Sequence, residues 1–348
     1  MEIDISVLQG SILGVILFLV YINDLPNATD LYKIIFADDS TCLAKDRNLR
    51  VLKTYLETEI QKLTCWFRAN KLALSMGKTQ FMVFHSKFNR EVNALDIYIN
   101  NNDFDSFDEN KITRLTQVPH NSKDPFIKML GCLLDEKLSF QFHLNHVATK
   151  ISGALGLLNR AKHLLNKDSL RLLYFALIHS HINYCSIIYF SAPDSALKRI
   201  VNIQKRAIRT ISKKRFNSHC EPIFKEAKIL PFDMLIKFNI LCFMWDHYNK
   251  KLPDSILSLF SYVGDNAGHG HDLRNQGDYY VGPHRFEYLK KFPFLHFTNL
   301  WNNFEPDFKY INSKSLFRLN LKEYFLNELR SSINCQRANC LDCRGAQS

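Results

Sequence analysis

Residues 31–44 read LYKIIFADDSTCLA, and this stretch decides the expected fold of the N-terminal part of the chain. Two short β-branched and aromatic runs flank the polar sequence Ala-Asp-Asp-Ser at 37–40, which is the pattern of a β-hairpin. Asp38 and Asp39 stand at the predicted turn, where a divalent cation such as Mg²⁺ could bind their carboxylate oxygens. A pair of aspartates is also a common solvated turn sequence, so the pair alone leaves both interpretations open.

Helical patterns surround this hairpin on both sides. Before it, Ser11 suits a helix N-cap ahead of the apolar run ILGVILFLVYINDL, which predicts a buried helix that ends near 24–26. After it, apolar residues recur every three or four positions between 49 and 70, which predicts an amphipathic helix.

The remainder of the chain changes from strands to helices. Strands are expected at 80–84 and 128–134, and the polar, turn-rich segment 100–125 is expected to be a long loop inserted between them. Further along, helical segments are expected near 143–165, 168–181, 194–214, 232–250 and 315–330. The sequence therefore predicts the α+β class.

The composition narrows the classes of partner. Of the 348 residues 46% are hydrophobic and 13% aromatic, which excludes disordered and low-complexity proteins. Lys and Arg number 45 against 34 Asp and Glu, and the resulting charge of +11 favours polyanions such as nucleic acid or an acidic membrane face.

The same sequence argues against membrane insertion and secretion. The longest apolar run, 12–22, is about half of the ~20 residues that cross a bilayer. The acidic first residues lack the basic n-region of a secretory signal. Six of the nine cysteines are scattered singly, as in proteins with reduced thiols, so we expect an intracellular protein.

Several short blocks occur in an order that points to a known family. The first blocks are QGSILG at 9–14, YINDL at 21–25 and FADD at 36–39. The next blocks are Trp66, NKL at 70–72, KT at 78–79, FMVF at 81–84, and MLG at 129–131 with Asp135 and Leu138. Beyond them stand LRLLY at 170–174, YC at 184–185, IQKRAIR at 203–209, HDLRN at 271–275 and LWN at 300–302. This series resembles the reverse transcriptases of non-LTR retrotransposons, the LINE-like transposable elements.

The resemblance implies an RNA-directed DNA polymerase, a nucleotidyltransferase that copies an RNA template from a DNA primer and uses Mg²⁺. Residues 1–138 would form a partial polymerase palm without the fingers or the first catalytic strand. Residues 139–262 would form a mostly helical thumb-like domain, and 263–348 a C-terminal region with a linker, a terminal helix and a cysteine-containing tail.

The matching blocks also imply roles for single residues. Asp38 and Asp39 would be catalytic and would bind Mg²⁺, and the catalytic Lys78 would lie near the leaving pyrophosphate. The residues expected to contact template or nucleotide are Gln9, Gly10, Ser11 and Phe36, and those expected to grip the primer end are Leu130 and Gly131.

Departures from the family pattern lower the expected activity. The family's first catalytic aspartate lies on a strand well upstream of the Gln-Gly-Ser block, whereas only eight residues precede Gln9 here, and Leu8 stands where the family usually has proline. We therefore expect a truncated copy with little or no polymerase activity by itself. The alternative is a non-enzymatic nucleic-acid-binding remnant.

A basic stripe is expected on the helix near 194–214. Its apolar positions Ile200, Ile203, Ala207 and Ile211 define one side, and its cations define the other: Lys198, Arg199, Lys205, Arg206, Arg209 and Lys213. Such a stripe could follow a nucleic-acid backbone, or it could be a solvated helix face.

Cysteines gather only in the tail. Cys335, Cys340 and Cys343 have a C-x₄-C-x₂-C spacing that could supply three zinc ligands, with no obvious fourth nearby. Only the last two have a common ligand spacing, so we expect the chain to hold no stoichiometric zinc.

Overall fold

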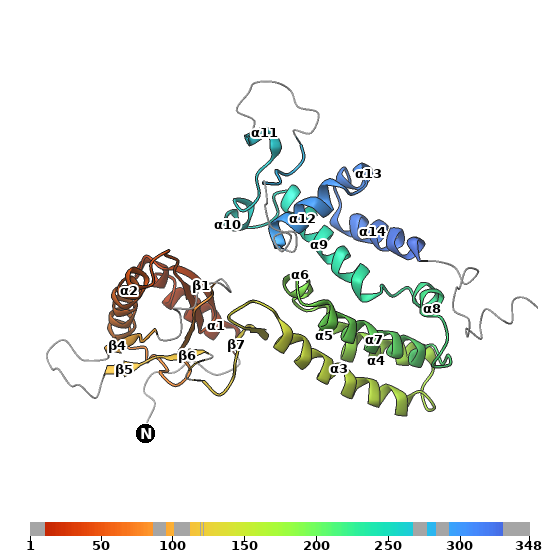
Figure 1. Ribbon diagram of the computed structural model, residues 1–348, viewed down its shortest axis with the longest axis horizontal. Coiled ribbons are helices and arrows are strands. Elements are labelled where there is room, and N and C mark those ends of the chain that lie inside the picture. Colours follow the sequence, from red (N-terminus) through yellow and green to blue (C-terminus); the bar gives the residue numbers. More distant parts are fainter. Residues whose placement is uncertain are drawn as a thin grey trace, which may run out of the picture. The chain divides into compact units, whose positions relative to one another are not determined.

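The computed structural model describes residues 11–85, 95–100, 112–118, 120, 122–266, 277–282 and 292–329. The chain divides into two compact units, one formed by 1–129 with 134–138 and the other by 130–133 with 139–348 (Figure 1). Helices and strands occur in both, so the fold is mixed helix and sheet, which is compatible with the expected α+β class. No helix among the described residues is both long and apolar enough to cross a bilayer.

Short strands and two long helices make up the first unit. Its elements are α1 (Ile12–Tyr21), the 3₁₀ turn η1 (Leu25–Asn27), β1 (Tyr32–Phe36), β2 (Asp39–Leu43), α2 (Leu49–Ala69), β3 (Gln80–Met82), β4 (Tyr98–Asn100), β5 (Ile112–Arg114), β6 (Thr116–Val118) and β7 (Ile127–Met129). β1 pairs with β2 and β4 with β5, both antiparallel, while β3 pairs with β6 in parallel. The described strands thus form separate two-stranded pairs.

Two expectations for this unit are wrong. Segment 100–125, expected to be a loop, contains β5 and β6, because Leu115 between them joins Leu95, Ile97 and Ile99 in a buried cluster beside α2. The second error concerns α1, which was expected to be buried and has no buried residue. Ser11 caps α1 as expected, since its Oγ accepts a hydrogen bond from the Gly14 N–H at 3.0 Å.

A buried carboxylate joins α2 to the chain ahead of β1. Glu59 is only 3% exposed, and its carboxylate accepts hydrogen bonds from Thr29 Oγ1 at 2.6 Å and from the Asp30 N–H at 2.8 Å. Lys62 Nζ lies 2.6 Å from its other oxygen. The hydrogen bond from Lys62, followed by that from Thr29, lowers the pKa of Glu59 to about 2.

This pKa predicts a pH-dependent stability of the full chain. A carboxyl whose pKa falls on folding stabilises the protein above its ordinary pKa of 4.5, and this contribution disappears as the pH falls towards 2. Replacing Glu59 with Gln should therefore reduce the urea midpoint at pH 6 more than at pH 3. Urea unfolding of both proteins at the two pH values measures this difference, and an equal loss at both would contradict it.

The second unit is almost entirely helical. Its elements are β8 (Cys132–Leu134), α3 (Gln141–Ala161), α4 (Lys167–Tyr174), the π-helix η4 (Phe175–His179), α5 (Ser180–Asn183), α6 (Ser186–Tyr189), α7 (Asp194–Ile211), α8 (Cys220–Glu226), α9 (Phe232–Tyr248), α10 (Asp254–Leu257), α11 (Val263–Asn266), α12 (Pro293–Asn302), α13 (Pro306–Lys309) and α14 (Lys314–Glu328). The helices lie close to the segments that hydrophobic periodicity indicates. α7 ends at Ile211, three residues before the expected position.

α3 and α7 run side by side in the same direction. Near their starts, Arg199 donates to Asn145 Oδ1 at 3.1 Å, and near their ends the Thr210 hydroxyl lies 3.0 Å from Asn159 Oδ1. Apolar side chains such as Ile151 and Ala207 are fully buried in these two helices. Both helices therefore end at the same edge of the unit.

Helices of the expected C-terminal region pack onto α9. Trp245 of α9 is fully buried, stacks on Phe317 of α14 with ring centroids 5.7 Å apart, and donates from its indole nitrogen to the Ile311 carbonyl at 2.8 Å. Trp301 of α12 lies against Tyr248 and Phe317. α12 and α14 thus share the second unit with α3 and α7.

Candidate nucleic-acid interface

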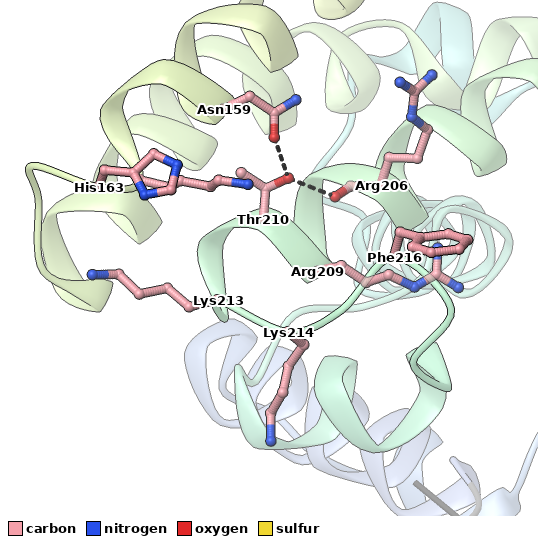
Figure 2. A pocket seen from close by; sticks show the side chains of 9 residues that line it. Asn159, His163, Arg206, Arg209, Thr210, Lys213, Lys214 and Phe216 are labelled. Atoms are coloured by element: carbon pink, nitrogen blue, oxygen red, sulfur yellow. Dashed lines mark hydrogen bonds between the residues drawn. The ribbon is translucent and has the colours of Figure 1, made fainter. Parts of the chain in front are cut away.

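A pocket of about 440 Å³ lies where α3 and α7 end (Figure 2). Five of the residues that line it are Lys or Arg, and none is Asp or Glu. The lining consists of Asn159, Lys162, His163, Arg206, Arg209, Thr210, Lys213, Lys214 and Phe216. We call it the cationic pocket.

The backbone explains why so many cations meet there. Lys162 and His163 directly follow α3, while Arg206 and Arg209 belong to the last turns of α7. The chain then reverses at Lys213, whose φ of 55° lies in the left-handed region. Cations beside helix C-termini also offset the negative end of the helix dipole, which is the alternative role of this cluster.

Hydrogen bonds hold several side chains of the cationic pocket in place. The Thr210 hydroxyl contacts both Asn159 Oδ1 and the Arg206 carbonyl at 3.0 Å, as the dashed lines in Figure 2 show. Arg209 donates from Nε to the Ser218 carbonyl at 2.8 Å, which ties α7 to the loop ahead of α8. This bond uses one of five guanidinium donors, so the planar group is held in place and the other donors can face an anion.

The expected basic stripe has the expected amphipathic form over α7, but Lys213, expected on this helix, lies in the turn after it, because α7 ends at Ile211. Its four apolar positions are all buried, whereas four of its cations are exposed (Lys198, Arg199, Arg206 and Lys213) and two are half-buried (Lys205 and Arg209). The cations do not form one continuous row, however. Lys205 and Arg209 also line a second pocket, of about 490 Å³, together with Glu221, Asp233 and Glu328.

Sequence reasoning missed part of the cationic pocket. Lys162, His163 and Lys214 were not singled out, nor was Phe216. The basic run at 160–163 was a signal in the sequence. Only the parallel packing of α3 on α7 places this run beside the C-terminal end of α7, however.

The β1–β2 hairpin forms as expected, with a different turn. Phe36 faces Asp39 in the register, so the two turn residues are Ala37 and Asp38, and Asp39 is the first residue of β2. Ala37 has a φ of 52°, which is uncommon for a residue other than glycine. Phe36, Asp38 and Asp39 are all exposed.

The described residues do not fit a complete Mg²⁺ site. Asp38 and Asp39 are neighbours, and no group of three or more His, Cys, Asp or Glu that could hold a metal ion occurs in the described part of the chain. Two-metal chemistry requires carboxylates that bind both ions at once. Two adjacent aspartates supply only part of that set.

The other expected site residues are spread over both units. Lys78 lies in the turn before β3, where its N–H donates to the Ser75 carbonyl at 3.1 Å. Leu130 and Gly131 form the turn after β7, with φ angles of 45° and 85°. Ser11 has the capping role described above. The remaining expected residues, Gln9, Gly10, Cys335, Cys340 and Cys343, lie outside the described residues.

Neither the protein-family models, nor the curated proteins, nor the solved structures contain a match to this chain. Its function is therefore inferred from the residues and contacts above.

Proposed function

We propose that this chain binds nucleic acid, and that phosphate groups of the nucleic-acid backbone lie in the cationic pocket. The observation that carries the proposal is the set of five Lys and Arg side chains that line one concave surface without a carboxylate. Clustered cations of this kind release counterions from a polyanion, which gives affinity without base recognition. The overall charge of +11 adds a long-range attraction for the negatively charged nucleic acid.

The salt dependence of binding tests this proposal. With four to five phosphates neutralised, the logarithm of the affinity for a 20-nucleotide oligonucleotide should fall against the logarithm of salt concentration with a slope of roughly −3 to −4. Fluorescence anisotropy at several salt concentrations measures it. A slope near zero, or no binding at low salt, would refute the proposal.

A second function, RNA-directed DNA synthesis, is favoured by one local feature. The β1–β2 hairpin exposes Asp38 at its turn, in the block whose order and spacing resemble LINE-like reverse transcriptases. On this proposal the first unit is a partial palm, the helices after residue 139 are thumb-like, and the partners are an RNA template and a DNA primer. Because the described carboxylates make an incomplete metal set, little activity is expected.

An extension assay separates this second function from binding alone. The purified 348-residue chain, given a primed homopolymer RNA and Mg²⁺, should incorporate nucleotides no better than its Asp38→Asn variant. Asp38 is exposed, so the substitution should leave folding intact and serve as a background control. Robust extension that disappears in Asp38→Asn would show that the chain completes the metal site.

A further inference from the structure

An exposed aromatic ring stands among the cations of the pocket. Phe216 is 89% exposed, and it lies in the loop between α7 and α8, beside Lys214 and Arg215. Figure 2 shows its ring on the same wall as Arg209 and across the pocket from His163. Single exposed apolar side chains are common on protein surfaces, so the significant feature is where this ring lies, among five Lys and Arg side chains.

We infer that the cationic pocket takes single-stranded nucleic acid, with one base stacked on Phe216 and adjacent phosphates on the surrounding Lys and Arg side chains. This inference rests on the binding function proposed above and adds the strand type. An aromatic ring in a cationic groove is the arrangement that binds single strands, because every base has a face to stack and none is free to do so inside a duplex. A pocket of about 440 Å³ is also within the range that holds small-molecule-sized ligands.

Substitution of Phe216 tests the strand type. Phe216→Ala should weaken binding of a 20-nucleotide single strand about 5- to 100-fold, while Phe216→Trp should retain it. The salt slope should not change, because no phosphate contact is lost. Binding of the matching duplex should also stay the same. Tyr310→Ala, at a ring that is 77% exposed in the same unit, is the matched control.

The possible failures are distinguishable. If Phe216→Ala binds the single strand as tightly as the unchanged chain does, or loses single strand and duplex equally, the strand inference is wrong and nucleic-acid binding stands. If the unchanged chain binds neither nucleic acid, the proposed function itself fails.

Discussion

Replacing Arg206, Lys213 and Lys214 with Gln is expected to weaken binding of a single-stranded oligonucleotide roughly 100-fold at 0.15 M salt. All three side chains are exposed and line the cationic pocket, so the variant removes charge and little packing. If each reaches a phosphate, the salt slope should flatten by about two to three units. Fluorescence anisotropy against salt measures both quantities.

A matched variant separates pocket charge from overall charge. Lys150, Lys237 and Lys250 are exposed in the same unit and outside the cationic pocket, and their replacement with Gln removes the same three charges. This control should lose only the small share of affinity that comes from net charge. Equal losses in the two triple variants would mean that the affinity comes from overall charge and not from the cationic pocket.

The largest effect on stability is expected at Gln204, a fully hydrogen-bonded amide in the core of the second unit. It is 1% exposed, and its Nε2 donates to the Tyr174 hydroxyl and to the Leu230 carbonyl, each at 3.0 Å. Its Oε1 accepts from the Phe232 N–H at 2.8 Å. Gln204 therefore holds α7 against α4 and the start of α9.

Gln204→Leu should lower the free energy of unfolding by about 3 kcal/mol, because it leaves the buried Leu230 carbonyl and Phe232 N–H without their hydrogen-bond partner. The midpoint of urea unfolding measures the loss. Gln141→Leu, at an exposed position at the start of α3, should change stability by no more than about 0.5 kcal/mol. A loss at Gln204 as small as at Gln141 would show that this network does not stabilise the unit.

Local patterns predicted the elements better than their assembly. Apolar periodicity indicated α2 and α7, and the β-branched runs around Asp38 indicated the β1–β2 hairpin. The same periodicity assigned α1 to a core that it does not enter, because a continuous apolar run shows how hydrophobic a helix is and not what covers it. β5 was hidden in a polar segment, since it pairs with β4, and Leu115 after it is buried only by packing against Leu95, Ile97 and Ile99.

The candidate site was predictable on α7 and unpredictable beyond it. The amphipathic pattern of the helix expected at 194–214 indicated Arg206 and Lys213 from the sequence alone, although Lys213 lies in the turn after α7. Lys162 directly follows another helix, α3, and its place in the pocket depends on α3 and α7 running parallel, which no local spacing indicates. Phe216 gave no signal, because an isolated phenylalanine in a sequence is ordinarily a core residue.

Lysine footprinting of the full chain tests the central claim most directly. The chain is labelled with an amine-reactive reagent, with and without a saturating single-stranded oligonucleotide, and each lysine is quantified by mass spectrometry. The proposal predicts severalfold slower labelling of Lys213 and Lys214 in the complex and unchanged labelling of Lys237 and Lys250. Equal labelling of Lys213 and Lys214 in the free and the saturated chain would contradict it.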